Sequence, residues 1–63
     1  MTPAEIAQKM REHLGRVRSA ALMMANAQSA LNRERYLQNI SKEMKSAFAL
    51  LDKLEKLEKL ENG

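Results

Sequence analysis

Apolar side chains recur every seven residues along most of the chain, in two stripes that are out of phase. The first stripe consists of Met10, Val17, Met24 and Leu31. The second consists of Leu37, Met44 and Leu51. A seven-residue spacing indicates an amphipathic helix with one apolar face. On one straight helix, at about 100° per residue, the two stripes would point roughly 150° apart. We therefore expect two helices rather than one.

A turn between the stripes would fold both apolar faces into one core. The register places the first helix at residues 3–31, the turn near residues 32–35 and the second helix at residues 33–61. Asn32 is the best turn residue, because asparagine is favoured both just after a helix and at an N-cap. The predicted fold class is all-α, an antiparallel two-helix hairpin that forms a single domain over residues 1–63.

Two local signals concern the first helix. Thr2-Pro3-Ala4-Glu5 predicts its start, with a hydroxyl at the N-cap, proline at the first helical position and glutamate two residues later. Gly15 could end a short first helix and give three helices in all. The seven-residue spacing continues through Gly15, however, and glycine costs a helix only about 1 kcal/mol relative to alanine. An uninterrupted helix is the preferred prediction.

The size of the chain predicts self-association. A domain of 63 residues buries little surface and usually needs disulfides, a metal or oligomerisation. The sequence has no cysteine and one histidine, so we expect no disulfide, metal or other cofactor. The apolar stripes are about three positions wide per heptad, which suits a four-helix bundle better than a two-stranded coiled coil. We expect a homodimer, or an obligate helical partner, held by core and interface residues Ile6, Met10, Leu14, Val17, Met24, Leu31, Leu37, Ile40, Met44, Phe48, Leu51 and Leu54.

Two further apolar residues lie outside the first stripe. Leu22 and Met23 make the middle of the first helix apolar nearly all round. Such a helix must be covered on several sides, which one neighbouring helix cannot do. Leu22 and Met23 are therefore a possible partner surface.

Basic residues suggest an alternative class of partner. The formal net charge is +3, and the candidate basic residues are Lys9, Arg11, Arg16, Arg18, Arg33 and Arg35. A basic helical face can bind nucleic-acid phosphates, so an RNA-binding helical dimer is the alternative function. No nucleic-acid-binding motif accompanies these charges, and a solvated helix face is the preferred interpretation of them.

No catalytic constellation is present. His13 lies at the edge of the first apolar face, and the acidic residues, Glu43 among them, are spaced as surface charges. The segment Ser41-Lys42-Glu43-Met44-Lys45-Ser46-Ala47-Phe48 resembles the phosphoacceptor helix of sensor histidine kinases, where Ser-His-Glu-Leu-Arg-Thr-Pro-Leu is usual. Lys42 stands in place of the phosphorylated histidine and Ala47 in place of the proline. The resemblance therefore implies a dimerising hairpin and no phosphotransfer.

The sequence thus predicts a small protein without enzymatic activity. The longest apolar run, residues 20–25, is far below the roughly 20 residues that span a bilayer, and no secretory signal is visible. We expect a cytoplasmic protein–protein interaction module, with no membrane contact, that acts as a regulator, adaptor or chaperone-like subunit.

Overall fold

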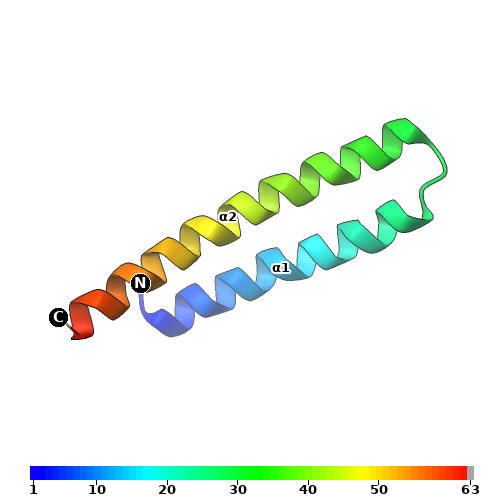
Figure 1. Ribbon diagram of the computed structural model, residues 1–63. Coiled ribbons are helices and arrows are strands. Elements are labelled where there is room, and N and C mark those ends of the chain that lie inside the picture. Colours follow the sequence, from blue (N-terminus) through cyan, green and yellow to red (C-terminus); the bar gives the residue numbers. More distant parts are fainter. Residues whose placement is uncertain (63) are drawn as a thin grey trace.

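The computed structural model describes residues 1–62, with the side chains of residues 1–60. Two helices, α1 (Pro3–Asn26) and α2 (Ala30–Asn62), run antiparallel and are joined by a short loop (Figure 1). No strand occurs within these described residues. The predicted all-α hairpin is confirmed.

The start of α1 follows the predicted capping pattern. The Glu5 backbone N–H donates to the Thr2 hydroxyl at 3.2 Å, and this hydroxyl donates to the Glu5 carboxylate at 3.1 Å. Pro3 occupies the first turn, where its missing N–H would have had no partner. Gly15 lies inside α1, which continues through it without a break. The preference for an uninterrupted first helix is confirmed.

The turn lies at residues 27–29, so its predicted position near residues 32–35 is wrong. Ser29 is the reason, because its hydroxyl accepts from the Asn32 backbone N–H at 3.2 Å and its carbonyl accepts from the Arg33 N–H at 3.1 Å. Ser29 is thus the N-cap of α2, and Asn32 lies inside the helix. Leu31 consequently belongs to the first turn of α2 rather than to the end of the first helix, where the sequence had placed it.

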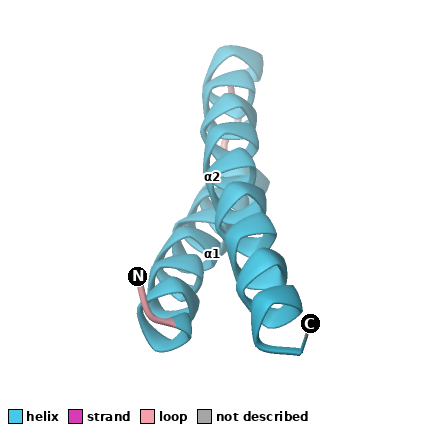
Figure 2. Ribbon diagram, turned by 90° about the vertical axis from the view of Figure 1, so that its left-hand side faces the viewer, coloured by secondary structure: helices cyan, strands magenta, loops and turns pink. Residues whose placement is uncertain are grey.

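The two helices differ in length. α1 has 24 residues and α2 has 33, and a contact between His13 and Glu43 fixes their register. In this register Pro3 is level with about residue 53, so residues 54–62 of α2 extend roughly 13 Å past the start of α1. We call residues 54–62 the overhang. In Figure 2 the two axes are inclined to each other and separate toward the terminal ends.

The core is thin. Four apolar side chains of the described residues are buried, namely Ile6, Ala20, Ala47 and Leu50. The hairpin measures 50 × 14 × 13 Å, and its radius of gyration of 14.9 Å exceeds the roughly 10.6 Å of a compact chain of this length. Its accessible surface is 5087 Å², whereas a compact monomer of 7.2 kDa would expose about 4100 Å². The single hairpin therefore leaves about 1000 Å² more surface in water than a compact protein of its mass.

Candidate interaction surface

The residues predicted for the core or interface fall into three groups. Ile6 is buried between the helices. Seven are half-buried: Met10, Val17, Met24, Ile40, Met44, Leu51 and Leu54. Four are exposed: Leu14, Leu31, Leu37 and Phe48. Leu50 is buried although it is not among the predicted core residues, and the two buried alanines allow the helices to approach closely.

Several of these residues meet on one side of the hairpin. They line a hollow of ≈ 190 Å³ formed by Met10, Leu14, Met44, Ala47, Phe48 and Leu51, which we call the apolar face. No charged side chain lines it. Two of its members are large and open to solvent, Leu14 at 48% and Phe48 at 57% exposure. Large apolar side chains gathered on one face of a small soluble protein are typical of an interaction site.

The apolar surface continues along α2 in both directions. Leu37 lies seven residues before Met44 and so projects from the same side of α2, where it is exposed. Toward the overhang, Leu51 also lines a shallow groove of ≈ 490 Å³ with Leu54, Glu55, Glu58 and Lys59. Two leucines and three charged side chains line this groove, so the apolar surface of α2 continues here beside charged side chains.

The opposite side of the hairpin carries charged and polar side chains among its apolar ones. At about 100° per residue, Leu14 and Met23 lie on opposite sides of α1. Met23 lines a groove with seven other residues, mostly polar or small: Glu12, Gly15, Arg16, Ser19, Ala20, Tyr36 and Asn39. The two sides of the hairpin thus differ in chemistry, because charged side chains line this groove and none lines the apolar face.

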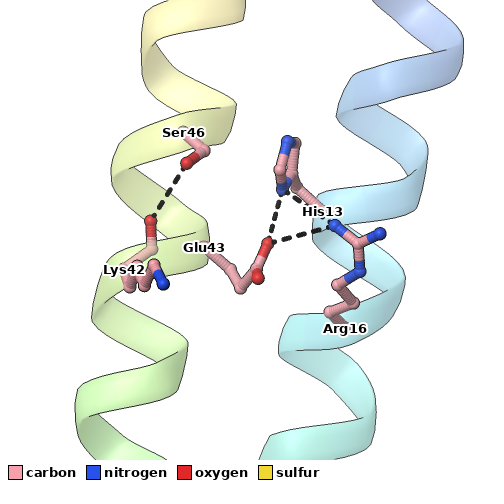
Figure 3. A network of polar contacts seen from close by, with 5 residues as sticks. All are labelled: His13, Arg16, Lys42, Glu43 and Ser46. Carbon is pink, nitrogen blue, oxygen red and sulfur yellow. Dashed lines mark hydrogen bonds and ion pairs between the residues drawn. The ribbon is translucent and has the colours of Figure 1, made fainter.

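A polar cluster joins the two helices beside the groove that Met23 lines (Figure 3). His13 Nδ1 lies 2.5 Å from Glu43 Oε2, and Arg16 Nη1 lies 3.7 Å from the same oxygen. Arg16 Nη1 is also 3.5 Å from His13 Nδ1. An ionised carboxylate only accepts, so His13 Nδ1 must donate to Glu43 and cannot also accept from Arg16. Arg16 therefore pairs with the carboxylate, which is 15% exposed.

The environment of Glu43 favours its charged form. The hydrogen bond from His13 lowers the pKa of Glu43 below its usual value, and the positive charge of Arg16 acts in the same direction. Partial burial opposes these effects without cancelling them. The sequence interpretation of Glu43 as a surface charge is therefore wrong, because this residue bridges the helices.

The residues of the other two predicted surfaces, the possible partner surface and the basic residues, are not gathered into one patch. Leu22 and Met23 are both more than half exposed. The six candidate basic residues are all exposed, and Arg16 contacts Glu43. At about 100° per residue Arg11 and Arg18 share one side of α1, while Lys9 and Arg16 share another, roughly 160° away. These charges are spread around the hairpin instead of forming one basic face.

Comparisons with protein-family models, with curated proteins and with solved structures find no match to this chain. Within the described residues, no helix is both long and apolar enough to cross a membrane. Nor do these residues include a cluster of three or more acidic, histidine or cysteine side chains placed to hold a metal ion.

Proposed function

We propose that this chain is a small, non-enzymatic, cytoplasmic interaction protein that works by self-association. Two hairpins pack through their apolar faces and form a four-helix bundle. The bundle then acts as a regulator, adaptor or chaperone-like subunit. The observation that carries the proposal is the apolar face, a hollow without charged lining residues beside the exposed Phe48.

The surface area supports this assembly. The hairpin exposes about 1000 Å² more than a compact monomer of its mass, while a stable interface of standard size buries about 800 Å² on each partner. The surplus surface of the whole hairpin is thus as large as the area that each partner of such a dimer buries. Burial of about 800 Å² would also bring the exposed surface of each protomer to about 4300 Å², close to the roughly 4100 Å² of a compact monomer of its mass.

The burial of apolar side chains also favours assembly of two hairpins. Two of the four buried core residues are alanines, whose burial stabilises a fold little. Removing Leu14 and Phe48 from water would add about 2 kcal/mol each. Small domains commonly have net stabilities of only a few kcal/mol, so this addition is large compared with the stability of the single hairpin.

Two matched substitutions test the proposal. Phe48 and Leu31 are both large, apolar and exposed on α2, at 57% and 59%, and they lie about 100° apart around the helix. Leu31 does not line the apolar face. We expect Phe48→Glu to raise the dissociation constant of the dimer at least about tenfold, because it places a charge in an apolar interface. Leu31→Glu should raise it far less, because Leu31 lies outside the apolar face. Light scattering over a concentration series measures both, with circular dichroism to follow helix content.

Equal dissociation constants for the two variants would overturn the apolar face as the interface. If Phe48→Glu also loses helix content, the comparison with Leu31→Glu remains valid, because both substitutions introduce the same side chain at equally exposed positions of one helix. A helical Leu31→Glu variant that forms dimers beside a monomeric Phe48→Glu variant would support the proposal.

A further inference from the structure

We infer that the two hairpins run antiparallel in the dimer, with the twofold axis passing through the apolar face beside Phe48. The loop end of each hairpin then lies against the terminal end of the other. This inference rests on the proposed function, and it adds the orientation and register of the two copies.

The position of the hollow supports this register. α2 covers residues 30–62, so its midpoint is at residue 46. Met44, Ala47 and Phe48 line the hollow on either side of this midpoint. Met10, which lines it from α1, is level with residue 46 in the register set by the His13–Glu43 contact. If the twofold axis passes through the hollow, the two copies of α2 therefore lie side by side along their whole length.

The shape of the apolar face is self-complementary in this arrangement. In a twofold dimer every contact occurs twice, so a side chain that one protomer inserts into its partner is matched by the same side chain of the partner. Phe48 is an exposed aromatic side chain that forms part of the wall of a hollow of ≈ 190 Å³. With the axis at the hollow, each Phe48 lies over the hollow of the other protomer. An aromatic anchor in an apolar pocket is typical of the residues that dominate binding energy.

The overhang also gains a partner. Residues 54–62 extend past α1, so Leu54 and the groove beside it have no neighbouring helix of their own hairpin on that side. In the antiparallel dimer this segment lies against the loop end of the other hairpin, where both helices of that protomer are present. In a parallel dimer the two overhangs would meet only each other.

Charge favours the same orientation. The loop half of the hairpin, residues 11–45, contains seven basic and three acidic side chains. The terminal half, residues 1–10 and 46–62, contains four basic and five acidic side chains. An antiparallel dimer places the basic half of one protomer against the half of the other in which acidic side chains slightly outnumber basic ones. A parallel dimer would place the two basic halves together, and such like-charge contacts are unfavourable.

Distance measurements between spin labels distinguish the two orientations. The chain has no cysteine, so Gln28→Cys in the loop and Lys45→Cys near the midpoint of α2 each provide a unique attachment site for a nitroxide. Double electron–electron resonance on the labelled full chain then measures the distance between the two copies. At 1.5 Å per residue, the antiparallel dimer predicts about 50 Å for Gln28→Cys. Lys45→Cys should give about 25 Å or less, because adjacent helix axes are 8–10 Å apart.

The outcomes separate this inference from the proposed function. The expected result is a long distance for Gln28→Cys together with a short one for Lys45→Cys. Short distances of about 25 Å or less for both labels would show a parallel dimer, which overturns the orientation and leaves self-association intact. The absence of dipolar coupling for both labels, in a chain that light scattering shows to be monomeric, would overturn the proposed function itself.

Discussion

At the scale of single residues, Glu43 links the helices by charge where the apolar core is thin. His13 and Arg16 approach its carboxylate from α1, at 2.5 Å and 3.7 Å. A carboxylate whose pKa is lowered by folding stabilises the folded state in its ionised form. This contribution is fully present above the pKa of the unfolded chain. It decreases as the pH falls and is lost below the lowered pKa of the folded chain.

We therefore expect the hairpin to lose stability in acid, and Glu43→Gln to lose less. Glutamine cannot ionise, so the variant should be less stable than the unsubstituted chain near neutral pH and closer to it in acid. Urea unfolding followed by circular dichroism, from about pH 7 to about pH 3, measures the difference. Glu34→Gln, at an exposed glutamate in the same helix, is the matched control. A constant difference between the unsubstituted chain and Glu43→Gln at every pH would contradict this role of the Glu43 charge.

At the scale of helices, the fold depends on where the chain turns. The seven-residue spacing predicted two packed helices correctly, because the periodicity of a helix is visible in any amphipathic sequence. The turn was misplaced because Leu31 extends the first apolar stripe although it belongs to α2. Ser29 carried the missing signal, since a serine hydroxyl three residues before a helical N–H is a typical N-cap. Asn26 adds to the helix end by donating to the Leu22 carbonyl at 3.1 Å.

Removal of this cap should destabilise α2. We expect Ser29→Ala to lower the free energy of unfolding by about 1 kcal/mol, because the Asn32 backbone N–H loses its acceptor. Ser29→Asp restores a side-chain oxygen next to the positive end of the helix dipole and should stay near the unsubstituted chain. Urea unfolding measures both variants. Equal stability of Ser29→Ala and the unsubstituted chain would mean that Ser29 does not cap α2.

At the scale of the whole molecule, the register of the two helices decides which residues meet. With the turn centred near residues 33–34, His13 would have been opposite about residue 54, and its pairing with Glu43 could not be predicted. The observed loop brings these two residues together and leaves α2 with its overhang. The apolar character of Met10, Leu14, Met44 and Phe48 was visible in the sequence. Their meeting in one hollow depends on this register, which periodicity alone does not give.

The central claim is that the hairpin is half of a larger core. The most direct test is the molar mass of the unsubstituted chain by light scattering across a dilution series, with helix content measured on the same samples. We predict twice the chain mass of 7.2 kDa at high concentration, and a joint loss of mass and helix content on dilution. A fully helical chain that remains at 7.2 kDa at every concentration would contradict the account.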